Sequence, residues 1–113
     1  MKGYNHITLV GNIVRDPDMR YTPDGKAVTK FTVAVNRNFK KEGQDEVDFI
    51  PVVTFGKLAE ICGEYLKKGT SVLTDGRLAI RSYEKDGQKV FVTEVIADEV
   101  NILSGSKPKT DEN

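Results

Sequence analysis

The sequence predicts a small all-β domain in which five strands form a Greek-key barrel, with one α-helix between the third and the fourth strand. Three observations support this prediction. Apolar residues recur at every second position in five short segments, which is the period of a strand with one buried face. A single segment has the period of a helix, and Pro and Gly residues mark turns between the segments. A chain of 113 residues fits one domain of this kind.

The five predicted strands are bounded by polar or Gly-containing segments and cover residues 7–14, 28–36, 47–55, 72–80 and 90–97. In the first strand, Gly11 indicates the bend that a strand needs to curl into a small barrel. The segment from Thr22 to Gly25 predicts a turn, because its Pro fixes one dihedral angle and its Gly accepts a positive φ. Asp86 and Gly87 predict a hairpin turn between the last two strands.

One helix is predicted from Lys57 to Lys68, and Gly69 is placed to end it. Its apolar residues have the spacing of a single stripe: Leu58, Ile61, Cys62, Tyr65 and Leu66. The order of strands and helix matches the OB-fold, a five-stranded barrel that binds oligonucleotides or oligosaccharides. We expect this domain to cover residues 1–104, and residues 105–113 to form a short disordered polar tail.

The charges of the chain cancel, since 17 Lys and Arg residues face 17 Asp and Glu residues. This balance argues against a binder whose affinity comes from bulk positive charge. The charge is nevertheless uneven along the chain: residues 1–41 carry +5, residues 42–64 carry −5, residues 65–92 carry +3 and residues 93–113 carry −3. The two basic stretches predict a basic track on one face, and ordinary scatter of surface charge is the alternative.

Catalytic and metal-binding residues are few. His6 and Cys62 are the only His and Cys residues, so the parts of a metal cluster or of a Cys/His or Ser/His catalytic group are missing. We therefore predict a protein that is not an enzyme and that has no cofactor. A single Cys also excludes an intrachain disulfide and fits a cytoplasmic protein, and no apolar run is long enough to span a membrane.

Several aromatic residues lie beside basic residues, an arrangement typical of proteins that stack rings on bases and neutralise phosphates. Phe39 precedes Lys40 in a polar loop, and Tyr83 lies between Arg81 and Lys85 near the hairpin turn. For Phe39 and Tyr83 we favour stacking over a local hydrophobic contact. Phe49 and Phe55 share one face of a strand that is apolar on both sides, and the pattern alone favours a place in the core.

Several motifs along the chain resemble the bacterial single-stranded DNA-binding protein (SSB) family, and the match is collinear from about Asn5 to Leu103. The motifs are the segment from Asn12 to Gly25, Phe55-Gly56-Lys57-Leu58-Ala59-Glu60, Glu64-Tyr65-Leu66-Lys67-Lys68-Gly69 and Val92-Thr93-Glu94-Val95. The resemblance implies a homotetrameric OB-fold that wraps single-stranded DNA in the nucleoid, in replication, recombination, repair or DNA uptake. It implies stacking by Phe39, Phe49, Phe55 and Tyr83, and phosphate contacts by Arg37, Lys40, Lys57, Lys68 and Arg81.

The end of the sequence departs from the family pattern. Full-length members carry a long linker and an acidic, Phe-terminated tip, whereas this sequence ends at Asp111-Glu112-Asn113. The expectation is a short form, as in members linked to DNA uptake, phages or plasmids, and the departure puts tip-mediated recruitment of replication or repair proteins in doubt. Two alternatives stay open: a primosome-type OB module whose main partner is a replication protein, and an RNA-binding module of the cold-shock type.

Overall fold

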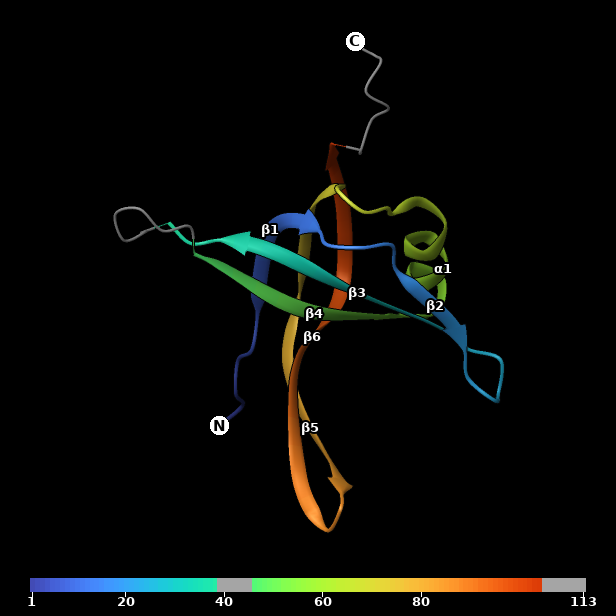
Figure 1. Ribbon diagram of the computed structural model, residues 1–113, viewed down its shortest axis with the longest axis vertical. Helices are drawn as coiled ribbons and strands as arrows, with labels where there is room; N and C mark the ends of the chain where they lie inside the picture. The colour runs from blue at the N-terminus through green and yellow to red at the C-terminus, as the bar shows by residue number, and fades with distance from the viewer. Residues whose placement is uncertain (39–45, 105–113) are drawn as a thin grey trace.

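The computed structural model describes residues 1–38 and 46–104, and it contains six strands and one helix (Figure 1). In chain order these are β1 (Ile7–Ile13), β2 (Asp18–Tyr21), β3 (Ala27–Asn36), β4 (Val47–Phe55), α1 (Gly56–Tyr65), β5 (Ser71–Lys85) and β6 (Gln88–Ser104). The five predicted strands and the predicted helix are all present. No helix in residues 1–38 and 46–104 has the length and apolarity needed to cross a membrane.

Five of the strands pair in a closed ring. β1 pairs with β5, β5 with β6, β6 with β4, β4 with β3, and β3 returns to β1 through Asn12 and Ile13. All of these pairings are antiparallel except that of β4 with β6. The ring and the helix between its third and fourth strands confirm the predicted OB-fold.

The sixth strand, β2, was not predicted. It pairs with β3 alone, with Tyr21 opposite Ala27 and Asp18 opposite Lys30. All four of its residues are exposed, so they show none of the alternation between apolar and polar side chains that predicts a half-buried strand.

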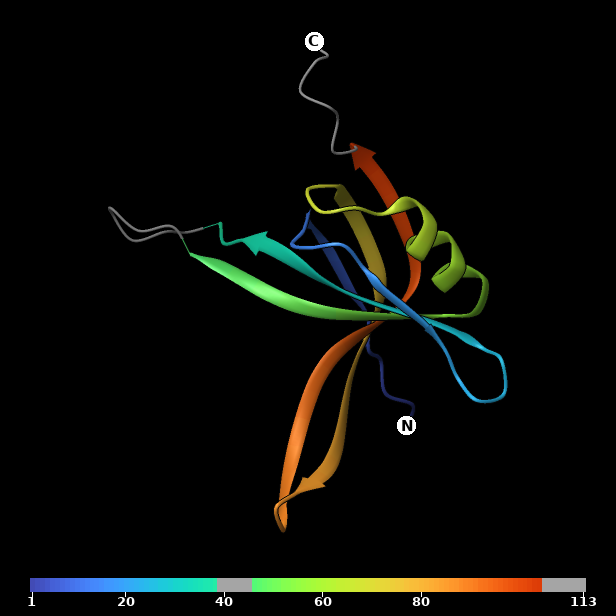
Figure 2. The same ribbon diagram turned by 45° about the vertical axis from the view of Figure 1, so that its right-hand side comes forward.

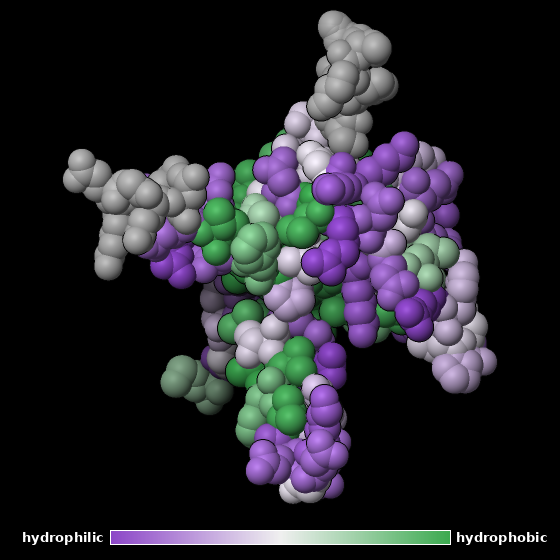
Figure 3. All heavy atoms as spheres, in the orientation of Figure 1, coloured by the Kyte–Doolittle hydropathy of each residue, from purple (hydrophilic) through white to green (hydrophobic). Residues whose placement is uncertain are grey.

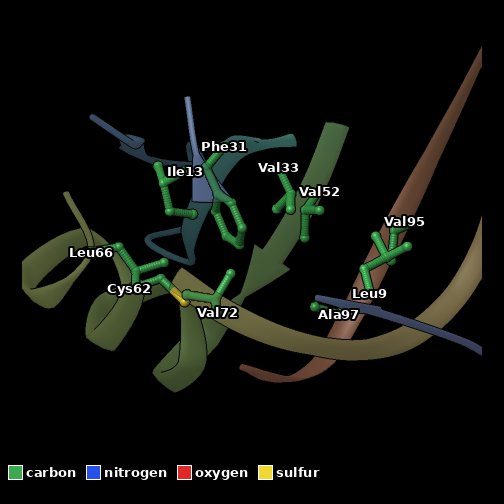
Figure 4. Packing of buried hydrophobic residues seen from close by; sticks show 10 residues of the cluster. All are labelled: Leu9, Ile13, Phe31, Val33, Val52, Cys62, Leu66, Val72, Val95 and Ala97. Atoms are coloured by element: carbon green, nitrogen blue, oxygen red, sulfur yellow. The ribbon is translucent and has the colours of Figure 1, made fainter. Parts of the chain in front are cut away.

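The core fills the ring and the space beneath α1 (Figure 4). Its buried residues come from all five strands of the ring and from the segment around the helix: Leu9, Ile13, Phe31, Val33, Val52, Cys62, Leu66, Val72, Val95 and Ala97. On β3 and β4, Phe31 lies opposite Val52, so one face of this strand pair supplies the core and the other is free to form a surface.

One buried threonine attaches the helix to the ring, and a second one links β4 to β3 beside it. The Thr29 hydroxyl donates a hydrogen bond of 2.6 Å to the Ala59 carbonyl, and the Thr54 hydroxyl donates one of 3.1 Å to the Thr29 carbonyl. These bonds satisfy polar groups that would otherwise be costly to bury.

The helix is shorter than predicted. It ends at Tyr65, because Leu66 is extended, and the Leu66 N–H still donates to the Cys62 carbonyl. Gly69 does have a positive φ of 92°, but its N–H bonds to the Ile13 carbonyl, so it turns the chain toward β1 instead of capping the helix.

The predicted apolar stripe of the helix was partly wrong. Ile61 and Tyr65 are exposed, and Ala59, which the stripe omitted, is fully buried together with Cys62. The side of the helix that packs against the ring is therefore narrower than the spacing of its apolar residues indicated.

Beyond the ring, β5 and β6 continue as a two-stranded arm that projects away from the barrel (Figures 1 and 2). The arm ends at Asp86 and Gly87, whose φ angles of 53° and 80° confirm the predicted hairpin turn. Leu78 and Ile80 share the alternation of Val72 along the strand, but they lie on the arm and are exposed, because the arm has left the core.

Candidate nucleic-acid interface

The two rings of β4 lie on the outer surface of the barrel. Phe49 is 63% exposed and Phe55 is 43% exposed, so neither belongs to the core that the pattern alone favoured. They share a strand face with Pro51 and Val53, opposite the face that carries Val52 into the core. Figure 3 shows apolar residues gathered over β3 and β4 and along the arm.

Between the two rings lies a groove of about 320 Å³. It lies over β3 and β4, between the segment before β2 and the base of the arm. Its lining residues are Arg15, Asp16, Asp18, Lys30, Phe31, Thr32, Pro51, Val52, Val53, Arg81, Val92 and Glu94. The groove is hollow, partly apolar and bounded by charged residues, which suits a flat base held beside a phosphate.

The charges that line the groove balance. Three are basic and three are acidic, and Arg81 donates a hydrogen bond of 3.1 Å to Glu94, which is nearly buried. The groove therefore has a mixed lining, in which Arg81 already has an acidic partner, and it does not by itself form the basic track that the charge distribution along the sequence predicts.

Tyr83 lies on the arm and is 45% exposed. It is two residues beyond Arg81 on β5 and opposite Val90, and Arg81 is opposite Val92, so all four residues share one face of the arm. Because Arg81 and Val92 line the groove, this face of the arm continues the surface of the groove toward the arm tip, and Tyr83 lies on it.

Arg37 follows β3 directly and is held by two carboxylates. Its guanidinium lies 2.7 Å from Glu46 and 2.9 Å from Asp48, and its Nε also donates to Asp48. The hydrogen bond from Arg37 lowers the pKa of Asp48 below its ordinary value, and the two acids raise the pKa of Arg37. The charge of this predicted phosphate contact is therefore largely neutralised in the protein without DNA.

Lys57 and Lys68 lie near the two ends of the helix, and both are exposed. Lys57 is two residues after Phe55, and the Lys68 N–H donates to the Asp16 carboxylate, which fixes the loop beside the groove. No ion pair between residues that the structure describes engages either lysine. The predicted residues Phe39 and Lys40 lie outside the described residues.

Three basic residues at this surface were not among the predicted contacts: Arg15, Arg20 and Lys30. Lys30 alternates with the buried Thr29 and Phe31, so the period of β3 could have placed it on the outer face. Arg20 lies on the unpredicted β2, where it contacts Asp18, and no pattern in the sequence indicated its position.

Neither a metal cluster nor a reactive thiol is found among the described residues. In residues 1–38 and 46–104, no group of three or more His, Cys, Asp or Glu residues is arranged to hold a metal ion. Burial raises the pKa of the Cys62 thiol to about 11, which keeps it protonated and unreactive at neutral pH.

Known proteins match the chain over the segments that form this surface. The model of the single-strand binding protein family matches residues 4–103. The chain is 54% identical over 101 residues to single-stranded DNA-binding protein 2 of Staphylococcus aureus, covering 88% of this chain and 72% of the relative. It is 47% identical over 111 residues to single-stranded DNA-binding protein 2 of Clostridium acetobutylicum, covering 96% and 84%. The solved Plasmodium falciparum SSB complex with ssDNA matches with a TM-score of 0.84 and 25% identity, covering 92% of this chain and 98% of that one.

Proposed function

Because the chain belongs to the single-strand binding protein family, we propose that it binds single-stranded DNA without reading its sequence. The observation that carries the proposal is the exposure of Phe49 and Phe55 on one face of β4, with the groove between them. Exposed rings stack on any base, because every base has a π-face, and this makes binding tolerant of sequence.

The proposed roles of the site residues are assigned on the same surface. Bases stack on Phe49, Phe55 and Tyr83, with Phe39 assigned by the resemblance alone. The proposed phosphate contacts are Arg37, Lys57, Lys68 and Arg81, with Lys40 assigned by the resemblance alone. Among the four of these cations that the structure describes, Lys57 and Lys68 have no acidic partner within the described residues, so they offer a phosphate a stronger attraction than Arg37 and Arg81 do.

The proposed assembly is a homotetramer, as the resemblance implies. Exposed apolar side chains on β1 and β6, among them Val10 and Ile102, support the burial of a further surface by association. A measured mass of four times 12.6 kDa would support this assembly. A dimer with weak DNA affinity would instead favour the primosome-type alternative. The proposed setting is the cytoplasm, in replication, recombination, repair or DNA uptake, without catalysis.

A titration of labelled oligo-dT, about 35 nucleotides long, tests the function, with duplex DNA and an RNA oligomer of the same length as competitors. Tight binding that duplex DNA fails to displace supports stacking on single strands. Equal displacement by duplex DNA would contradict the proposal, and preferential displacement by RNA would favour a cold-shock type of function.

A further inference from the structure

The short strand β2 has two surfaces with different neighbours. Asp18 and Arg20 contribute to the lining of surface hollows on the side of the DNA groove, whereas Met19 and Tyr21 line a separate cleft against α1. This second hollow, the β2–α1 cleft, has a volume of about 510 Å³, and it is lined by Met19, Tyr21, Glu60, Gly63 and Glu64. A volume of this size accommodates a small ligand or a few side chains of a peptide.

The apolar part of the β2–α1 cleft depends on a close approach of helix to strand. A Cβ atom at Gly63 would collide with the sulfur of Met19 and lie 3.0 Å from its Cβ, so the absence of a side chain at Gly63 lets Met19 lie directly against the helix. Tyr21 remains 59% exposed beside it. An exposed tyrosine and a partly exposed methionine at the edge of a hollow form an adaptable apolar contact surface.

The charged part of the β2–α1 cleft is acidic. Glu60 and Glu64 lie four residues apart, and thus on the same side of α1. No ion pair within residues 1–38 and 46–104 engages either carboxylate. Two negative charges beside the cleft repel phosphates, so DNA is a poor occupant, and they attract Lys or Arg side chains.

We propose that the β2–α1 cleft is a docking site for a basic peptide segment of a partner protein, with one apolar anchor side chain. The anchor packs on Met19 and Tyr21, and flanking Lys or Arg residues pair with Glu60 and Glu64. The chain's own residues 105–113 do not fit this description, because they contain two basic and two acidic residues and no large apolar side chain. This site is separate from the proposed DNA surface and does not depend on it.

Three fluorescein-labelled synthetic peptides of ten residues test the proposal: one with Lys and Arg around a single central Phe, one with Ser in place of the Phe, and one with Glu in place of the basic residues. Fluorescence anisotropy is expected to show saturable binding of the first peptide alone. The amide signals of Met19, Tyr21 and Gly63 in NMR spectra should shift during this titration.

Charge removal at the cleft provides the decisive comparison. The double substitution Glu60→Gln with Glu64→Gln is expected to weaken peptide binding about fivefold, and Tyr21→Ala should weaken it by a similar factor. The matched control, Asp98→Asn with Glu99→Gln, removes the same charge from exposed positions of β6 and should leave the affinity unchanged. Equal weakening by the cleft and control variants would overturn the proposal, as would shifts confined to residues outside the cleft.

The same peptide, added to protein saturated with oligo-dT, separates this site from the DNA surface. Unchanged peptide affinity is expected, and displacement of the peptide by oligo-dT would overturn the assignment. The Phe49→Ala variant should bind the peptide normally even where its DNA binding is weakened, so a failure of either proposal can be recognised without the other.

Discussion

Phe49 and Phe55 leave β4 on the same face, six residues apart, and the β4 residues that line the groove lie between them. At the rise of an extended strand the two rings are separated by roughly 20 Å. A single strand that crosses the groove would therefore meet one ring at each side of it. The predictions for DNA binding follow from this spacing and from the charges beside it.

Replacing either ring is expected to weaken DNA binding. Phe49→Ala and Phe55→Ala should each cost about 1–3 kcal/mol of binding free energy to oligo-dT, a range known from proteins of this family and not obtained from this structure. Fluorescence titration at fixed salt measures the loss.

Phe91→Ala is the matched control for the two rings. Phe91 is as exposed as Phe49, at 65%, but it lies opposite Ser82, on the face of the arm away from Tyr83 and the groove. It should leave the affinity unchanged. A loss with Phe91→Ala equal to that of the β4 variants would mean that general surface apolarity, and not the groove, binds the DNA.

Gly11 is expected to be essential for closure of the ring. A Cβ atom at this position would collide with the Ala34 carbonyl and lie 2.7 Å from a side-chain methyl of Val33, where β1 crosses to β3. Gly11→Ala should reduce the free energy of unfolding in urea by about 1–3 kcal/mol, the usual range for overpacking. Gly3→Ala, which meets no atom within 4 Å, should be neutral. Equal stability of the two variants would refute a tight contact at Gly11.

The sequence was sufficient to predict the strands in which every second side chain is buried. Alternation puts Phe31 and Val33, within residues 28–36, on one side of a strand, and both are core residues of β3. It also placed Phe49 and Phe55 on one face of β4, but it could not say which face meets the core, because both are apolar. That choice is made by the pairing of β4 with β3 and β6, which brings Val52 inward.

Other features depended on contacts between distant residues. Arg37 and Asp48 are eleven positions apart and meet because β3 and β4 pair in a register that places Val35 opposite Asp48. Local periodicity contains no information on that register. Tyr65 belongs to the predicted apolar stripe of the helix but is exposed, because spacing on a helix defines a stripe and not how much of it the barrel covers.

The pair of Asp48 and Arg37 is expected to make stability depend on pH in the acid range. The hydrogen bond from Arg37 lowers the pKa of Asp48 in the folded state. A carboxyl with a lowered folded pKa stabilises the fold above its unfolded pKa, and this contribution disappears as the pH falls through the folded pKa. Asp48→Asn should therefore lower Tm slightly at pH 7, and the difference from the unsubstituted protein should shrink below about pH 4.

The control for this pH dependence is Asp98→Asn, at an exposed acid that forms no ion pair with a described residue. Thermal unfolding followed by circular dichroism at pH 7, 5 and 3 measures both variants. A Tm difference for Asp48→Asn that stays constant down to pH 3 would show that its effect comes from packing and not from the charge.

The salt dependence of DNA binding should distinguish free cations from those with acidic partners. Each phosphate contact releases counterions and contributes about 0.7 to the slope of log K against log salt for a single strand. Lys57→Ala should reduce the slope by about this amount. Arg37→Ala should reduce it less, because Glu46 and Asp48 already neutralise the guanidinium and must be displaced before a phosphate can take their place. Titrations with oligo-dT at five salt concentrations give both slopes. Equal reductions by Lys57→Ala and Arg37→Ala would mean that the ion pairs of Arg37 with Glu46 and Asp48 do not limit its contact with phosphate.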